Sequence, residues 1–192
     1  MKIGVLAVQG AVTEHLGHLK KCGIEAVAVK DRESLTETCG LIIPGGESTT
    51  IGKLVEIFGL ADLIRQRNRQ GSLAVFGTCA GMVLLASEVL DGIKNQPKLG
   101  LMNIEVQRNA FGRQRESFET ELDFETLDSP LTAVFIRAPI VKKSGPEVEI
   151  LADLPEGIVA ARQGNLLVTS FHPELTDDLR THQYFINMCR EI

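Results

Sequence analysis

A cysteine between two glycines carries the most specific chemical signal in the sequence. Cys79 lies in the string Gly77-Thr78-Cys79-Ala80-Gly81, after an apolar run and before a helical pattern. This spacing is typical of a sharp strand-to-helix turn, in which side chains at the glycine positions would clash with neighbouring backbone. The turn places the thiol near a helix N-terminus, which favours the thiolate, and lets the Ala80 N–H face a developing oxyanion. In isolation, the pattern also fits a buried cysteine between tightly packed glycines.

A histidine and a carboxylate follow a later apolar run, in the string Phe171-His172-Pro173-Glu174-Leu175. A cysteine nucleophile needs a base that takes its proton and later protonates the leaving amine. His172 suits that role, and Glu174 can orient the imidazole and stabilise its protonated form. Alone, the string fits a solvated surface turn equally well, so its meaning depends on Cys79.

A third segment, Pro44-Gly45-Gly46-Glu47-Ser48-Thr49-Thr50, has the composition of a ligand-binding loop. Two glycines after a strand let backbone N–H groups approach a ligand. Ser48 or Thr49 is expected to cap the helix that follows. The segment is not a phosphate-binding P-loop, because no Gly-Lys-Ser/Thr follows.

The other histidines offer weaker sites. His15 and His18 lie three residues apart beside Glu14 on an expected helix, where a metal site is conceivable but no third ligand is evident. A solvated helix face is the expected environment of both. His182 is expected to be exposed on the C-terminal helix.

Strand and helix patterns alternate through the first half of the chain. Short apolar runs predict strands at 3–8, 26–29, 40–43 and 73–76. Apolar residues at helical spacing predict helices at 11–22, 48–58, 61–70 and 80–90. Such alternation indicates βαβ units and a parallel sheet, and catalytic groups gather at the carboxyl ends of its strands.

The second half consists mostly of predicted strands and turns. The strands are expected at 103–107, 117–122, 133–136, 148–151, 158–162 and 166–170, before a helix at 176–192. The fold class is therefore α/β, with a mostly parallel central sheet flanked by helices and extra antiparallel strands in the second half. The length of 192 residues predicts one domain, residues 1–192.

Composition excludes several classes of function. The net charge of −5 without a Lys/Arg run makes nucleic acid and anionic membranes poor partners. The apolar stretches are too short to span a bilayer, and the N-terminus is expected to form a strand and not a signal peptide. The four cysteines are widely spaced, which favours reduced thiols in the cytoplasm over disulfides or zinc.

The three chemical segments together resemble the class I, triad-type glutamine amidotransferases. The strings GTCAG, PGGESTT and SFHPEL occur in the order and at the separations typical of that family. More narrowly, VLAVQGA, PGGESTT, RNAFGRQ at 108–114, SFE at 117–119 and FIRAP at 135–139 resemble the glutaminase subunits of pyridoxal 5′-phosphate synthases. The resemblance spans nearly the whole chain and implies a flavodoxin-like fold.

The resemblance also assigns roles to individual residues. It implies a catalytic triad of Cys79, His172 and Glu174, and an oxyanion hole formed by the backbone of Gly46 and Ala80. It assigns glutamine binding to Gly46, Glu47, Ser48, Arg108, Ile136 and Arg137. Arginine suits the α-carboxylate of free glutamine, although either arginine alone would be read as a surface residue.

The implied activity is hydrolysis of L-glutamine to glutamate and ammonia through a glutamyl thioester, with no metal or organic cofactor. The resemblance further implies that ammonia passes to a (β/α)8-barrel synthase subunit, in a large ring-shaped complex that makes pyridoxal 5′-phosphate (vitamin B6). Two alternatives remain at this level. One is a cysteine hydrolase or peptidase, and the other is a non-catalytic or redox-sensing protein of the same fold in which Cys79 oxidises reversibly.

Overall fold

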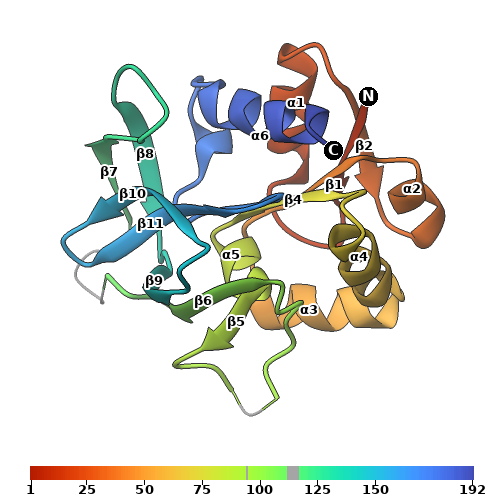
Figure 1. Ribbon diagram of the computed structural model, residues 1–192, viewed down its shortest axis with the longest axis horizontal. Coiled ribbons are helices and arrows are strands. Elements are labelled where there is room, and N and C mark those ends of the chain that lie inside the picture. Colours follow the sequence, from red (N-terminus) through yellow and green to blue (C-terminus); the bar gives the residue numbers. More distant parts are fainter. Residues whose placement is uncertain (94, 112–116) are drawn as a thin grey trace.

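The central sheet brings together strands from both ends of the chain. The computed structural model describes residues 1–93, 95–111 and 117–192. In these residues the large sheet has the strand order β2-β1-β3-β4-β12-β11-β9-β6-β5, with β10 paired to β11. Figure 1 shows helices on both sides of the central strands, and strands β7, β8, β10 and β11 gathered to the left.

The parallel part of the sheet confirms the α/β prediction. It consists of β2 (Glu25–Val29), β1 (Lys2–Leu6), β3 (Gly40–Ile43), β4 (Ala74–Thr78) and β12 (Leu166–Thr169). Strands β3, β4 and β12 are buried along their whole length, as expected of parallel strands covered on both faces. Because β4 pairs with β12, the segments that follow these two strands lie side by side.

Helices cover both faces of this parallel part. On one side lie α1 (Val12–Lys21) and α6 (Arg180–Arg190), and on the other α3 (Ser48–Ile57), α4 (Leu60–Arg69) and α5 (Ala80–Leu85) (Figure 1). A short helix, α2 (Arg32–Thr36), connects β2 to β3. None of the helices in the described residues reaches the length and apolar character that crossing a bilayer requires.

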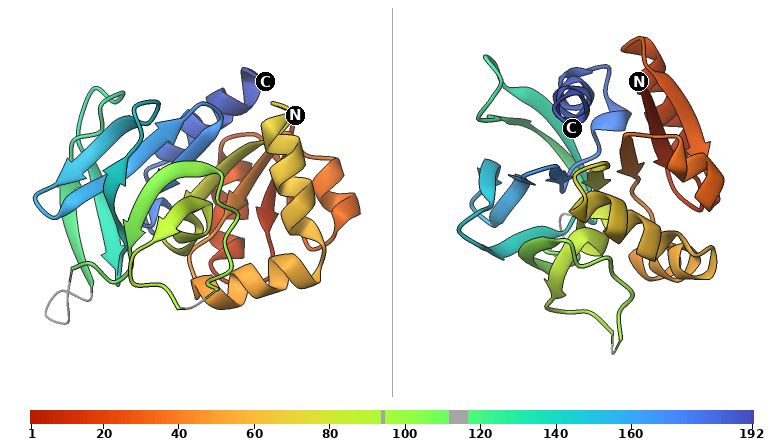
Figure 2. Two further views of the ribbon diagram at one scale, coloured as in Figure 1. Left: turned by 60° about the horizontal axis from the view of Figure 1, so that its bottom comes forward. Right: turned by 45° about the vertical axis from the view of Figure 1, so that its right-hand side comes forward.

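The second half extends the sheet with antiparallel pairs. They join β12 to β11 (Gly157–Gln163), β11 to both β9 (Ile140–Ser144) and β10 (Glu149–Leu154), and β9 to β6 (Met102–Gln107). Strand β5 (Ala86–Val89) then pairs in parallel with β6. A separate antiparallel pair joins β7 (Ser117–Leu122) to β8 (Leu131–Ile136). Figure 2 (left) shows these strands, green to blue, beside the orange and gold helices α3 and α4.

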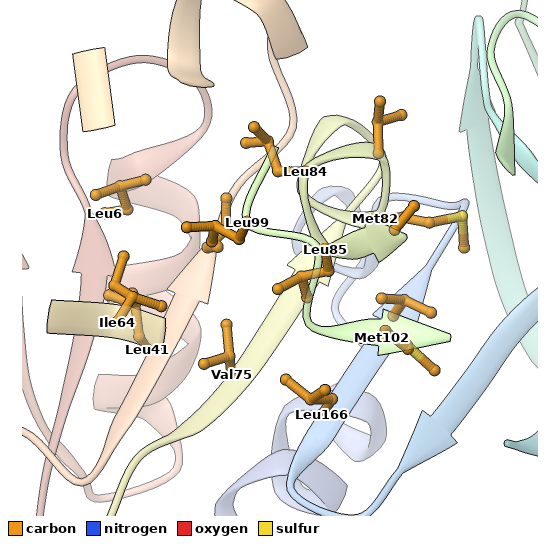
Figure 3. Packing of buried hydrophobic residues seen from close by; sticks show 14 of the residues in the cluster. Leu6, Leu41, Ile64, Val75, Met82, Leu84, Leu85, Leu99, Met102 and Leu166 are labelled. Carbon is orange, nitrogen blue, oxygen red and sulfur yellow. The ribbon is translucent and has the colours of Figure 1, made fainter. Parts of the chain in front are cut away.

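Alternating side chains of the parallel strands fill two apolar cores. Leu41 and Val75 point into one core, which Figure 3 shows with Met82, Leu84 and Leu166 around them. Their sequence neighbours point into the other core, where Phe76 packs on Phe185 of α6 at a ring distance of 5.5 Å. Because successive side chains of a strand point to opposite faces of the sheet, each strand packs against the helices on both faces.

The predicted helix 80–90 is wrong beyond its first half. Helix α5 ends at Leu85, Ala86 has an extended backbone, and β5 pairs in parallel with β6 through Ala86 and Met102. An apolar run fits a buried helix and a buried strand equally well, so only pairing with β6 decides. The predicted strand boundaries elsewhere agree with the structure to within a few residues.

Other differences are small. The sequence patterns did not predict α2, whose N-terminus is capped by the Asp31 carboxylate accepting from Ser34 N, nor strand β9. The expected helix 176–192 begins only at Arg180, after the short 3-10 helix η1 (Pro173–Leu175). Part of the expected RNAFGRQ segment, residues 112–114, lies outside the described residues.

Candidate active site

Strand β4 leads directly into the cysteine at a sharp turn before α5. Cys79 has φ 48° and ψ −101°, a conformation that non-glycine residues rarely adopt. A Cβ on Gly77 would lie 2.5 Å from the carbonyl carbon of Gly81, and one on Gly81 would overlap the carbonyl oxygen of Ile43. The Cys79 N–H donates to Thr169 O at 2.8 Å, which ties the turn to β12. The predicted sharp turn from strand to helix, here called the elbow, is therefore confirmed.

The histidine and the glutamate lie where β12 ends. The His172 N–H donates to Val134 O at 2.8 Å, and Glu174 sits in the short helix η1. The ring Nδ1 of His172 is 2.8 Å from Oε1 of Glu174, whose side chain is fully buried. A carboxylate therefore contacts the imidazole, as expected of the third member of a triad, and this carboxylate is shielded from water.

The electrostatics of His172 favour a protonated ring. Burial alone would lower its pKa, but hydrogen bonds to Cys79 and Glu174 outweigh this effect and raise the pKa of His172 to about 10. The imidazole is thus flanked by the thiol on one side and the carboxylate on the other. Such an arrangement can hold a thiolate–imidazolium pair, which is the reactive form of a cysteine nucleophile.

The glycine loop after β3 packs against the same two residues. A Cβ on Gly45 would lie 2.5 Å from Cε1 of His172 and 3.5 Å from Cβ of Cys79, so only glycine allows this approach. Next to it, the Glu47 N–H donates to Oε1 of Gln9 at 3.0 Å. The backbone of Gly45 therefore lies beside Cys79 and His172, where the expected oxyanion hole would lie.

The glutamate of this loop caps a helix. Its carboxylate accepts from Thr49 N at 3.1 Å and Thr50 N at 2.8 Å, which makes Glu47 the N-cap of α3. The expectation that Ser48 or Thr49 caps this helix is therefore wrong, because Ser48 already lies within the first turn. Burial alone would raise the pKa of Glu47, but hydrogen bonds from Thr50 and Thr49 lower it to about 2.

One cavity of about 460 Å³ gathers all the residues expected to act on substrate. Its lining includes the expected triad, oxyanion and glutamine-binding residues: Gly46, Glu47, Ser48, Cys79, Ala80, Arg108, Ile136, Arg137, His172 and Glu174. The carbonyl oxygen of Ile136 lies 4.0 Å from the Cys79 Sγ. Arg137 has φ 43°, a further non-glycine residue in the left-handed region. Residues from five separate segments of sequence thus meet at one edge of the sheet.

Arg108 is held by two contacts that the sequence patterns do not indicate. Its N–H donates to Asp91 Oδ1 at 2.8 Å, and its Nη1 donates to Gln96 Oε1 at 3.2 Å. The Gln96 amide also donates to Ser48 Oγ at 3.3 Å. Gln96 therefore links the arginine to the start of α3, and its position in a loop of unremarkable composition left no signal in the sequence.

The expectation for the remaining histidines is wrong. His15 and His182 are fully buried, and His18 is 5% exposed. They lie together behind Glu174, where His15 Nε2 is 3.5 Å from Oε2 of the glutamate. The helical spacing of His15 and His18 reads as a polar face, but α6 covers that face. Among the described residues, no group of three or more histidine, cysteine, aspartate or glutamate side chains is arranged to hold a metal ion.

Comparison with known proteins identifies the family. The family model described as the SNO glutamine amidotransferase family matches residues 5–191. Over 191 residues the chain is 55% identical to pyridoxal 5′-phosphate synthase subunit PdxT of Niallia circulans, covering 100% of this chain and 99% of that protein. The equivalent subunit of Moorella thermoacetica is 54% identical over 189 residues, covering 98% and 99% of the two proteins.

A solved structure agrees with this match. A crystal structure of a glutamine amidotransferase superposes with a TM-score of 0.94 at 51% identity, covering 98% of each chain. The chain belongs to the SNO glutamine amidotransferase family.

Proposed function

We propose that this chain hydrolyses the side-chain amide of L-glutamine and supplies the ammonia to a synthase that makes pyridoxal 5′-phosphate. The observation that carries the proposal is the placement of His172. Its Nδ1 is 2.8 Å from the buried Glu174, and the ring lines one cavity together with Cys79 and a glycine loop. Family membership supports the substrate class.

The first half of the reaction forms a covalent intermediate. The Cys79 thiolate attacks the side-chain amide carbon of glutamine, and the carbonyl oxygen becomes an oxyanion. The N–H groups of Gly46 and Ala80 stabilise this charge. The C–N bond then breaks while His172 donates its proton to the leaving nitrogen, so that ammonia departs and a γ-glutamyl thioester remains.

The second half releases glutamate. Neutral His172 takes a proton from a water molecule, which attacks the thioester carbonyl, and the thiolate leaves with the imidazolium restored beside it. Glu174 holds the ring by accepting from Nδ1, so the other nitrogen stays directed at the thiol and the attacking water. This cycle uses only groups of the chain, the substrate and water.

The cavity is suited to a small, doubly charged amino acid. We assign the α-carboxylate to the guanidinium groups of Arg108 and Arg137, which line the cavity. Ser48 and the backbone of Gly46, Glu47 and Ile136 complete the glutamine site. Because Glu47 uses its carboxylate to cap α3 and its N–H to donate to Gln9, we assign its contribution to glutamine to the backbone carbonyl oxygen.

The partner is proposed from the relatives. Proteins 54–55% identical to this chain are subunits of pyridoxal 5′-phosphate synthase. We therefore propose that ammonia passes to a (β/α)8-barrel synthase subunit in a large ring complex in the cytoplasm. The four cysteines are all unpaired, as expected of a protein that works in a reducing compartment.

Four conditions test the division of labour. The partner synthase, alone or with this chain, is given either ammonium or glutamine as its nitrogen source, and pyridoxal 5′-phosphate formation is measured. The partner alone is expected to work on ammonium, and to need this chain with an intact Cys79 when glutamine is supplied.

The Cys79→Ala chain is the matched control in this experiment. It is expected to dock and to leave the ammonium-dependent reaction intact, because the thiol lies inside the cavity. Use of glutamine by the partner alone, or failure of ammonium to replace this chain, would contradict the proposed function. Hydrolysis of peptides without hydrolysis of glutamine would instead indicate a peptidase.

A further inference from the structure

A row of three histidines runs from the back of the triad toward the protein surface. His15 and His18 come from α1 and His182 from α6, two helices on the same side of the sheet (Figure 1). Nδ1 of His15 lies 2.9 Å from Nε2 of His182, and Nδ1 of His18 lies 3.3 Å from Nδ1 of His182. At the inner end of the row, Nε2 of His15 is 3.5 Å from Oε2 of Glu174.

This contact involves a carboxylate oxygen of the triad that lacks a hydrogen-bond partner. Oε1 of Glu174 is 2.8 Å from His172, but Oε2 is buried and has no hydrogen-bond partner among the described residues. A buried carboxylate oxygen without a donor is unfavourable, because it has lost water without replacement. His15 Nε2 is the nitrogen placed to serve it, and a shift of a few tenths of an ångström brings the pair to hydrogen-bond distance.

Three neutral rings in a row can place their N–H groups in only two consistent arrangements. Burial lowers the pKa of His15 well below its usual value, and burial lowers the pKa of His182 to about 3. Each neutral ring then has one N–H and one lone pair. Either every N–H points toward Glu174, or every N–H points away and His15 turns a lone pair toward the carboxylate.

The buried carboxylate decides between these two arrangements. A lone pair against a negative oxygen is repulsive, whereas an N–H against it is a charge-assisted hydrogen bond. In the favoured arrangement His182 donates from Nε2 to Nδ1 of His15, and His15 carries its proton on Nε2. The Thr78 hydroxyl oxygen lies 3.4 Å from Nε2 of His15 and can then accept from the same N–H as the second acceptor of a bifurcated hydrogen bond.

We propose that His15, with its tautomer set by His182, is a positioning residue that donates to Glu174 and so orients the catalytic imidazole of His172. The proposal rests on the proposed function of the triad. Two donors, one on each carboxylate oxygen, hold the Glu174 side chain in one orientation. Because His15 is neutral, it fixes the carboxylate without cancelling the negative charge that stabilises imidazolium at His172.

Two amide substitutions separate positioning from packing. The side-chain amide of His15→Gln extends as far as Nε2 of histidine and can donate to Glu174. The shorter amide of His15→Asn reaches only the position of Nδ1, which faces His182. The two variants are equally polar, so they differ mainly in whether the carboxylate keeps its donor.

The experiment measures two quantities for each variant. The first is the rate of Cys79 alkylation by iodoacetamide as a function of pH, in the isolated chain without glutamine. The second is glutamate release with the partner synthase present. For His15→Asn we expect kcat to fall about 10- to 100-fold at little change in KM, and thiol reactivity to move to higher pH. His15→Gln is expected to stay within about 3-fold of the wild type in both measurements.

A histidine of the same cluster that does not contact Glu174 provides the control. His18→Asn is expected to leave the alkylation profile unchanged, because His18 reaches the carboxylate only through two other rings. If His15→Asn fails to fold, His182→Leu replaces it, and a smaller shift of the profile in the same direction is expected. Thermal unfolding of every variant reports the stability change separately.

Several outcomes would overturn the proposal. They are an unchanged alkylation profile in His15→Asn and His182→Leu, equal losses in His15→Asn and His15→Gln, or an equal effect of His18→Asn. Failure of the wild type to release glutamate would reject the proposed function instead. The alkylation profile needs no substrate, so it still reports whether His15 acts on the His172–Glu174 pair.

Discussion

Two helices that start at the same edge of the sheet begin in opposite ways. Helix α3 follows β3 with an ordinary extended N-cap, and the Glu47 carboxylate accepts from two of its first N–H groups. Helix α5 follows β4 with Cys79 at φ 48°, and no side chain in the described residues caps it. The N-terminal N–H groups of α3 are therefore hydrogen-bonded by a side chain. The start of α5 instead has a strained backbone, and its first N–H groups have no side-chain cap.

The difference separates a helix start that adds stability, that of α3, from one that is placed for the chemistry of the site, that of α5. Strained backbone and unsatisfied donors are unfavourable, and they persist where the surrounding structure holds them. At Cys79 the holding contacts are the tight packing of Gly77 and Gly81 and the hydrogen bond to Thr169. Helix α3 needs no such support, so its capped start can serve as a rigid wall of the cavity.

The largest expected effect comes from removing the proposed nucleophile at the strained start of α5. Cys79→Ala is expected to reduce glutamate release by about four or more orders of magnitude, while the free energy of unfolding changes by less than about 1 kcal/mol. A diazo-ketone analogue of glutamine is expected to label Cys79 alone, since it is the only cysteine among the described cavity residues. Mass spectrometry that finds the label on Cys22, Cys39 or Cys189 would reject this assignment.

The second effect tests the charge that supports the thiolate. The pKa of His172 is raised from its usual 6.5 to about 10, so this group stabilises the fold fully below about pH 6.5. That stabilisation is lost as the pH rises toward 10. In Glu174→Gln we expect a flatter decline of stability over this interval and a kcat about 10²- to 10⁴-fold lower. Urea unfolding at several pH values checks the first point, and parallel curves for the two proteins would contradict it.

A third test concerns the arginines on the cavity wall. Arg108→Ala and Arg137→Ala are each expected to raise KM, by the equivalent of about 1.5–3 kcal/mol, because each loses a charge-assisted contact to substrate. Steady-state glutamate release in the docked complex measures this change. Arg190→Ala, an exposed arginine bonded to Asn187 on α6, is the control. Unchanged KM in both cavity variants would show that the α-carboxylate binds elsewhere.

The smallest effect concerns the capped start. Glu47→Ala is expected to lower the free energy of unfolding by about 1 kcal/mol, with kcat changed by less than about 10-fold. The pKa of Glu47 lies at about 2 against a usual 4.5, so its stabilisation is present above pH 4.5 and lost as the pH falls toward 2. Acid unfolding of the wild type and Glu47→Gln measures this. A loss of activity as large as that of Cys79→Ala would mean that the carboxylate takes part in catalysis.

The parts of the site that follow directly after strands were predictable from sequence. The turn at Cys79 and the loop at Gly45 each need glycine for a close approach that the structure shows. Their short signals are local, because steric exclusion at one residue depends on its immediate neighbours. The segment Ala86–Val89 was not predictable, because its apolar pattern suits a helix as well as a strand.

The sequence alone determined the alternation of strands and helices, the elbow at Cys79 and the presence of a histidine and a glutamate after a later strand. These features depend on spacing over a few residues. Only the tertiary structure decided that Glu47 caps α3, that Gln96 holds Arg108 and that His15, His18 and His182 are buried behind Glu174. Burial is a property of what packs on top, and the helix that covers His15 comes 165 or more residues later, so no local pattern could report it.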